Sequence, residues 1–311
     1  MRGAARRSGA GDFEEDWRKV TSSQAAKIPL KTPSMPETTT GSTILLENYR
    51  FLKDYVYKES GIVLDDDKHY LVESRLMPVA VQEHLASLDA LCAALRGNAT
   101  PFLHRRVVEA MTTHETLFFR DVVPFDALRT GILPLLIEQR KSTRKLAFWS
   151  AAASSGQEAY SLAMLLLEAG LGGWNIQILG TDLSEQILAR AREGRYMQIE
   201  VNRGLPASYL LKYFERQGLD WQIRDSVRRM VTFEPFDLRK SMQAKGPFDV
   251  IFCRNVLIYF DVETKKKILG ELRGALFPGG YLVLGGAETT LNLDEKFRRL
   301  PAGRTTFYQA P

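Results

Sequence analysis

The spacing of apolar residues changes near residue 115 and divides the chain into two kinds of structure. Between residues 42 and 115, apolar side chains such as Leu46, Leu52 and Val56 recur at the three- and four-residue intervals of amphipathic helices. The pattern predicts a small all-α unit. Its expected helices are one that ends at Gly61, one that Asp65–Asp67 cap and Pro78 bends, one over 88–95 and one over 101–111.

Beyond residue 119, short apolar runs alternate with helical patterns. This alternation is typical of an α/β fold in which a mainly parallel sheet is covered by helices on both faces. Strands are expected over 146–149, 175–181, 221–223, 230–233, 248–253, 281–284 and 305–309, and helices over 157–169, 185–192, 206–214 and 262–276. The last two strands are joined by a loop without a helical pattern, which predicts an antiparallel terminal hairpin.

These patterns divide the chain into three parts. Residues 1–41 are rich in Gly, Ser, Thr, Pro and charge, and we expect them to form a disordered basic tail and linker. Residues 42–115 are expected to form an all-α N-terminal domain, and residues 116–311 an α/β domain.

A turn of small residues joins the first strand of the α/β domain to its first helix. The turn covers Ser150–Gly156, and the helical pattern begins at Gln157. Such a turn lets a ligand lie against the backbone, while the helix directs free N–H groups and its positive dipole end toward that ligand. The fingerprint G-x-G-x-x-G is absent, which argues against a diphosphate. The turn suits an adenosine cofactor without phosphates, such as S-adenosylmethionine; the alternative is a plain strand–helix turn of any α/β protein.

The overall composition is that of a globular protein. The 311 residues are 45% hydrophobic and 25% charged, and the net charge of +5 is weak support for a nucleic-acid partner. No apolar run approaches the roughly 20 residues that span a bilayer, and no apolar segment follows the first arginines as it would in a secretory signal. Cys92 and Cys253 lie far apart, which indicates a reducing cytoplasm. The four histidines show no H-x-x-x-H spacing, so no metal site is expected.

Several polar residues are expected at the carboxyl ends of strands, where open α/β sheets bind ligands. Asp182 follows the second strand, where an acid typically takes the ribose hydroxyls of an adenosine; it is equally suited to cap the helix at Ser184. Glu158 lies at the start of the first helix. It is expected either to contact an ammonium group of a cofactor or to be a surface glutamate that the helix dipole stabilises. Asp237 and Asn255 follow two later strands.

Arg120 follows two aromatic residues, Phe118 and Phe119, which are expected to pack in the core. An unpaired guanidinium is costly to bury beside them. Arg120 therefore either pairs with Asp121 or another acid, or points into the cleft between the domains.

Taken together, the motifs of the chain resemble those of the CheR family of chemotaxis receptor methyltransferases, which use S-adenosylmethionine. The matching motifs are Thr116–Arg120, Trp149–Ala152, Ser155–Ser161, Thr181–Ser184 and Phe248–Asp261. They follow the family's order and spacing over about residues 45 to 309, and the run C-R-N-V-L-I-Y-F-D is highly specific. The resemblance implies that residues 116–311 form a Rossmann-like methyltransferase catalytic domain with a small β-subdomain inserted at about 213–233.

The resemblance also implies the residues of the site. The expected cofactor-binding residues are His114, Thr116, Arg120, Glu158, Asp182, Asp237, Leu238, Arg254 and Asn255. His114 and Asp237 stand where relatives often have Asn, and Ala153 stands where the family usually has Cys. We expect Arg120 and Tyr259 to be catalytic and to orient the carboxylate oxygens or the cofactor around the reacting centre.

The implied activity is methyl esterification of glutamate side chains on the cytoplasmic helices of chemoreceptors, with S-adenosyl-L-homocysteine as the second product. A glutamate is already ionised at pH 7, with a reference pKa of about 4.3, so its methylation needs no general base. We expect a monomer that binds no nucleic acid and does not insert into the membrane. Its candidate contacts to acidic receptor helices are Lys68, Arg75, Arg105 and Arg106.

Two alternatives stay open. The first is a methyltransferase that acts on an amine or a nucleic-acid base, because Asn255 near Tyr259 loosely resembles the N-P-P-Y arrangement of base-modifying enzymes, without its prolines. The second is a non-catalytic module that binds S-adenosylmethionine.

Overall fold

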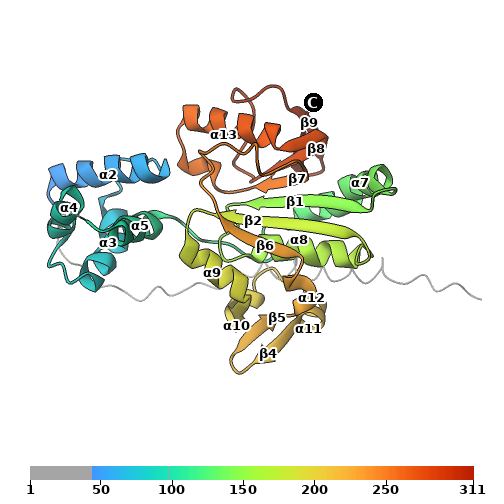
Figure 1. Ribbon diagram of the computed structural model, residues 1–311, viewed down its shortest axis with the longest axis horizontal. Helices are drawn as coiled ribbons and strands as arrows, with labels where there is room; N and C mark the ends of the chain where they lie inside the picture. The colour runs from blue at the N-terminus through green and yellow to red at the C-terminus, as the bar shows by residue number, and fades with distance from the viewer. Residues whose placement is uncertain (1–43, 98) are drawn as a thin grey trace, which may run out of the picture.

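The computed structural model describes residues 44–97 and 99–311 (Figure 1), so the expected tail over 1–41 lies outside the described residues. Within the described part of the chain, no helix combines the length and the apolar character that crossing a membrane requires.

The N-terminal helices form a bundle with its own core. They are α2 (Leu46–Ser60), α3 (His69–Gln82), α4 (Leu88–Arg96) and α5 (Pro101–Met111). The expected helix over 101–111 is confirmed end to end, because Thr100 caps its first turn and Pro101 occupies its first position. Side chains such as Leu52, Leu76 and Leu91 are completely buried in a cluster that contains residues of this bundle alone.

The expected cap of α3 is wrong. Lys68 is the residue that precedes the helix, and it makes no side-chain capping bond. Asp65–Asp67 form a turn instead, in which the Lys68 N–H donates to the Asp65 carbonyl (3.1 Å) and Asp66 pairs with Lys53. Pro78 lies inside α3, which continues to Gln82.

A sheet with the order β6-β2-β1-β7-β8-β10-β9 forms the centre of the α/β part. Its strands are β1 (Lys145–Ala151), β2 (Asn175–Asp182), β6 (Val231–Pro235), β7 (Phe248–Cys253), β8 (Leu276–Leu284), β9 (Arg298–Ala302) and β10 (Thr305–Gln309). The first five in the order run parallel, whereas β10 is antiparallel to both β8 and β9. The mainly parallel sheet expected from the alternating pattern is therefore confirmed.

Helices cover both faces of this sheet, as expected. The larger elements are α7 (Leu133–Arg140), α8 (Gln157–Glu168), α9 (Glu185–Glu193) and α13 (Val262–Gly274), with shorter turns at α6 (Val123–Ala127), η1 (Leu128–Ile132), α10 (Gln198–Val201), α11 (Ala207–Tyr213), α12 (Asp225–Arg228) and η2 (Leu257–Tyr259). Successive residues of a strand point to opposite faces. Accordingly, Phe148 packs in the cluster that contains α8, and Trp149 packs in the cluster that contains Leu269 of α13.

A second, three-stranded sheet lies outside the main one (Figure 1) and differs from the expected β-subdomain over 213–233. It has the order β3 (Arg195–Met197), β5 (Asp220–Ile223) and β4 (Phe214–Gln217), all antiparallel. The strand expected over 230–233 instead pairs with β2 in the main sheet. The three residues of β3 are too few to show a period in the sequence, so this strand was not predicted.

The C-terminal strands also differ in part from expectation. Pro278-Gly279-Gly280 was expected to separate the last helix from a strand over 281–284, but these residues lie inside β8, beside an irregular register opposite Phe248 and Val250. The expected antiparallel pairing of 281–284 with 305–309 is confirmed, because β8 and β10 pair antiparallel, but the hairpin itself joins β9 to β10. β9 was missed because its two arginines and Pro301 are typical of a protected edge strand and leave no apolar run.

The bundle meets the α/β part at the end of α2. The Val63 N–H donates to the Tyr259 carbonyl (2.9 Å), and the Tyr57 hydroxyl donates to Asp261 (2.8 Å). Arg239 donates to the last carbonyls of α2, those of Lys58 and Glu59. These contacts bring the residues after α2 to the carboxyl edge of the sheet.

Candidate active site

All ten residues expected at the site line one pocket between the bundle and the carboxyl edge of the sheet. The pocket holds about 930 Å³ of space, counted out to its open side, and both Ser60 and Ile62 of the bundle contribute to its wall. The expected residues are His114, Thr116, Arg120, Glu158, Asp182, Asp237, Leu238, Arg254, Asn255 and Tyr259.

The turn between β1 and α8 contains positive φ angles, which its small residues can adopt. Ala152 and Ser154 adopt left-handed conformations, with φ of 67° and 51°. The Ser154 N–H donates to Oδ2 of Asp182 (2.9 Å), and the Ser154 hydroxyl donates to the His114 carbonyl (2.8 Å). The turn therefore ties the end of β2 and the segment after α5 to one wall of the pocket.

Asp182 is buried at the end of β2 and keeps acceptor capacity on both oxygens. Oδ2 accepts the Ser154 N–H, and Oδ1 accepts the Ser184 N–H (3.1 Å). The N-cap of α9 is Ser184, whose hydroxyl accepts the Ile187 N–H, so Asp182 is not the cap. Burial raises the pKa of the Asp182 carboxyl, while its main-chain donors and His114 act in the opposite direction. Each oxygen retains a lone pair for another donor.

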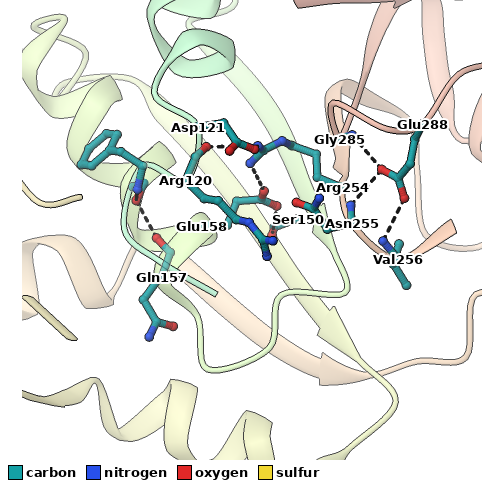
Figure 2. Close-up of polar contacts among 12 residues, drawn as sticks. Arg120, Asp121, Ser150, Gln157, Glu158, Arg254, Asn255, Val256, Gly285 and Glu288 are labelled. Carbon is teal, nitrogen blue, oxygen red and sulfur yellow. Dashed lines mark hydrogen bonds and ion pairs between the residues drawn. The ribbon is translucent and has the colours of Figure 1, made fainter. Parts of the chain in front are cut away.

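Glu158 is part of a chain of charges that is buried at Glu158 and Arg254 and reaches the surface at Asp121 (Figure 2). Its Oε1 accepts the Ser150 hydroxyl (2.7 Å), and its Oε2 pairs with Nη1 of Arg254 (3.0 Å). Nη2 of Arg254 reaches Asp121 (2.6 Å). The Arg254 side chain is 1% exposed. The alternative of a surface glutamate is therefore wrong.

Arg120 does not pair with Asp121, whose Oδ2 pairs with Arg254 instead. Its guanidinium donates to the Glu115 carbonyl (2.8 Å), and its half-buried side chain lines the pocket (Figure 2). Of the two options that the sequence left open, the structure supports the one in which Arg120 faces the cleft.

Asp237 and His114 each have a partner outside the expected set. Both oxygens of Asp237 accept from the guanidinium of Arg239, which also holds the end of α2. Nε2 of His114 lies 2.7 Å from the Thr112 hydroxyl. Burial lowers the pKa of His114, which leaves the imidazole neutral at pH 7.

Glu288 was missed by the sequence analysis. Its carboxylate accepts main-chain N–H groups of Asn255, Val256, Leu257 and Gly285, and so holds the loop that carries Arg254 and Asn255 into the pocket. No side-chain motif marks such a residue. The available signal was its position just after a strand that ends at the same edge of the sheet.

The residues present fit S-adenosylmethionine. Apolar side chains such as Phe236 and Val256 offer faces for a purine, and the free lone pairs of Asp182 suit ribose hydroxyls. The carboxylates that line the pocket, among them those of Glu158 and Asp182, offer acceptors for the ammonium group and attraction for the sulfonium of this molecule.

Comparison with known proteins gives two matches to families and several relatives. Residues 114–306 match the family described as CheR methyltransferase, SAM binding domain, and residues 47–112 match CheR methyltransferase, all-alpha domain. A chemotaxis protein methyltransferase of Vibrio parahaemolyticus is 40% identical over 276 residues, which cover 87% of this chain and 99% of that protein. Chemotaxis protein methyltransferase 1 of Pseudomonas aeruginosa is 40% identical over 269 residues, which cover 85% of this chain and 97% of that protein.

Proposed function

We propose that this chain, which belongs to the CheR methyltransferase family, esterifies glutamate side chains on the cytoplasmic helices of chemoreceptors and thereby serves chemosensory adaptation. S-adenosylmethionine is its cofactor. The names of the relatives support methylation in chemotaxis. The choice of a carboxylate as the methyl acceptor rests on the chemistry of the pocket.

The observation that carries this choice is that the carboxylates of Glu158 and Asp237, which line the pocket, are each held in an ion pair with an arginine. An ion pair favours the charged form of a carboxylate and so disfavours its uptake of a proton from a substrate. An amine or hydroxyl acceptor must lose a proton, whereas a glutamate is ionised at pH 7. The pocket therefore suits a carboxylate acceptor better than an amine.

When bound, S-adenosylmethionine supplies a methyl group on a positively charged sulfur, which a carboxylate oxygen displaces as the carbon–sulfur bond breaks to give S-adenosylhomocysteine. Asp182 would hold the ribose, and Glu158 would meet the ammonium group. Charge disappears as the carboxylate and the sulfonium neutralise each other, so exclusion of water favours the reaction. The chain's main contribution is to hold the two partners in line.

Arg120 and Tyr259 would orient the acceptor carboxylate. Both are half-buried and line the pocket. Within the described part of the chain the Tyr259 hydroxyl makes no hydrogen bond, so it is free to donate to an acceptor oxygen. Within the described residues the Arg120 guanidinium donates one hydrogen bond, to a carbonyl, and keeps further N–H groups for the acceptor.

The expected contacts to receptor helices need correction. Arg75 is not a free surface cation, because it donates to the Met111 and Thr112 carbonyls at the end of α5. Arg106 pairs with Glu83. Of the four expected cations, Arg105 is the exposed one, so docking through the bundle would rest on fewer charges than proposed from the sequence.

Transfer of a tritiated methyl group to a purified receptor cytoplasmic fragment tests this function. We expect label that mild base releases as methanol, and no label on a fragment whose acceptor glutamates are replaced by alanine. Label that survives base would indicate methylation of an amine or a nucleic-acid base. Cofactor binding without any transfer would indicate a non-catalytic binding module.

A further inference from the structure

Four main-chain N–H groups converge on the carboxylate of Glu288, and Figure 2 shows those of Asn255, Val256 and Gly285. Oε1 accepts from Val256 (2.9 Å) and Leu257 (2.8 Å), and Oε2 accepts from Asn255 (2.8 Å) and Gly285 (2.7 Å). Hydrogen bonds to an ionised acceptor are roughly twice as strong as neutral ones. One side chain thus holds three consecutive backbone N–H groups, those of residues 255–257, together with that of Gly285.

These donors lie where the ladder between two parallel strands stops. Cys253 at the end of β7 pairs with Leu284 at the end of β8. Beyond this pair the backbone N–H groups have no strand partner, and an N–H buried without an acceptor destabilises a protein. Glu288 supplies acceptors to both loops and joins them at the edge of the sheet that forms the pocket.

The loop needs such support because its backbone is strained. Asn255 has a φ of 58°, in the left-handed region that costs free energy for a residue other than glycine. Arg254 and Asn255 line the pocket, whereas Glu288 does not. At the far end of the same loop, the Tyr259 carbonyl accepts the Val63 N–H of the bundle.

Gly285 fits the same arrangement. A Cβ at this position would lie 2.7 Å from Oε2 of Glu288 and 2.9 Å from the Asn255 nitrogen, so a side chain would displace the carboxylate or the loop. Gly286 is the matched neighbour, because a Cβ there would meet nothing within 4 Å.

We propose that Glu288 is a positioning residue that sets the shape of the cofactor pocket by holding residues 254–257. Its carboxylate acts through the backbone of the loop and touches neither the cofactor nor the acceptor. The proposal concerns the pocket on which the proposed function rests. Its test measures amide exchange and cofactor binding, so its failure is distinguishable from failure of the glutamate-esterification proposal.

The first test uses Glu288→Gln. This substitution keeps the shape of the side chain but replaces one oxygen, which accepts two N–H groups, by an NH2 group that can only donate. We expect faster hydrogen exchange at residues 254–257 and 285 in the cofactor-free protein, with the peptides of α2–α5 unchanged. S-adenosylhomocysteine is expected to bind at least tenfold more weakly by calorimetry, and the KM for S-adenosylmethionine to rise more than kcat falls. Unchanged exchange together with unchanged binding would overturn the proposal. A lower unfolding temperature with binding and KM unchanged would also overturn it, since that is the signature of a purely structural role.

If Glu288→Gln does not fold, substitutions at Gly285 and Gly286 test the proposal instead. We expect Gly285→Ala to weaken S-adenosylhomocysteine binding at least tenfold and to loosen the same amides, while Gly286→Ala behaves as the unaltered protein. Equal effects of the two substitutions would overturn the proposal. Loss of the fold in both Glu288→Gln and Gly285→Ala, with Gly286→Ala folded, would assign the carboxylate to stability alone and overturn it as well.

Discussion

The two walls of the pocket are built differently. The sheet wall, formed by Asp182 and Arg254 at strand ends and by Glu158 in the first turn of α8, is buried, and each of its side chains has at least two polar partners. The junction wall, formed by Ile62, Arg120 and Tyr259, is half-buried. Its main link to the bundle is the bond between the Val63 N–H and the Tyr259 carbonyl.

This difference separates two tasks. Charges held by several buried partners cannot reorient cheaply, so the sheet wall offers a fixed electrostatic surface for one ligand. Donors that are half-exposed keep capacity for a second molecule that arrives from outside. We infer that the cofactor binds mainly to the sheet wall and that the acceptor enters along the junction wall.

The largest expected effect is a loss of unfolding free energy when a charged residue of the sheet wall is removed. Arg254→Ala removes the guanidinium from Glu158 and from the exposed Asp121, and removing one member of the buried Arg254–Glu158 pair costs about 3 kcal/mol. Urea unfolding monitored by circular dichroism measures the loss. The matched control is Arg120→Ala, which we expect to cost less than about 1 kcal/mol because, in the described part of the chain, its guanidinium donates one hydrogen bond, to a carbonyl. Equal losses in the two variants would erase the distinction between the walls.

The second-largest expected effect is on the affinity of the sheet wall for the cofactor product. Asp182→Ala is expected to weaken S-adenosylhomocysteine binding by about 1–3 kcal/mol, the cost of charge-assisted hydrogen bonds to the ribose. Calorimetric titration measures it. Ser184→Ala is the control, because it removes the cap of α9 without removing a pocket-lining group and is expected to lower stability by about 1 kcal/mol with affinity unchanged. An unaltered affinity in folded Asp182→Ala would leave Asp182 with a structural role only.

The same carboxyl gives a pH dependence. Because burial raises the folded-state pKa of Asp182 above its ordinary value of 3.8, ionised Asp182 costs stability at neutral pH, and this cost is relieved as the pH falls. Cofactor affinity moves the other way, since a protonated carboxyl loses its charge-assisted bonds. We expect binding to weaken on acidification before the pH reaches 3.8. The comparison variant Asp182→Asn should show a flatter profile, and a wild-type profile as flat as that of the variant would contradict the assignment.

The sequence predicted the pocket residues better than it predicted what holds them. Strands 248–253 and 305–309 and the helix 101–111 match the structure end to end, because their apolar runs and caps are clear signals. The candidate site residues gather in one pocket because parallel strands end at the same edge of the sheet.

The supporting contacts were not predictable in the same way. Glu288 recognises main-chain N–H groups, which every sequence has, so no pairing of residue types points to it. Arg239 joins Asp237 to the carbonyls of α2, which again are backbone groups. The expected surface role of Arg75 failed for the same reason. Contacts between a side chain and a distant backbone depend on the fold itself.

A substitution in the junction wall is expected to affect turnover more than stability. Arg120→Ala should keep the fold and reduce methyl transfer at least tenfold, which corresponds to about 1.4 kcal/mol of barrier. Arg120→Lys keeps the charge but loses the planar pair of donors, and we expect it to recover only part of the rate. Initial rates with saturating cofactor measure both. Full activity of Arg120→Ala would show that the acceptor is oriented by other groups.

The smallest expected effect tests whether the junction itself shapes the pocket. Gly61, which ends α2, has a φ of 77°, and a Cβ there would lie 2.8 Å from Cδ of Arg239. Arg239 cannot yield easily, because its guanidinium is held by Asp237 and by two carbonyls of α2. Gly170 has nearly the same backbone, with a φ of 76°, but a Cβ there would meet nothing within 4 Å.

The two alanine variants therefore separate backbone strain from the junction contact. Gly170→Ala should lose about 1 kcal/mol of stability, the cost of a Cβ in the left-handed region, and Gly61→Ala should lose at least as much because its Cβ also meets Arg239. Only Gly61→Ala should also shift Arg239, and with it Asp237 and the wall that Ile62 completes. We expect a two- to fivefold weaker affinity for S-adenosylhomocysteine in Gly61→Ala alone. If both variants bind it as the unaltered protein does, the bundle covers the pocket without shaping it, and the junction wall serves the acceptor only.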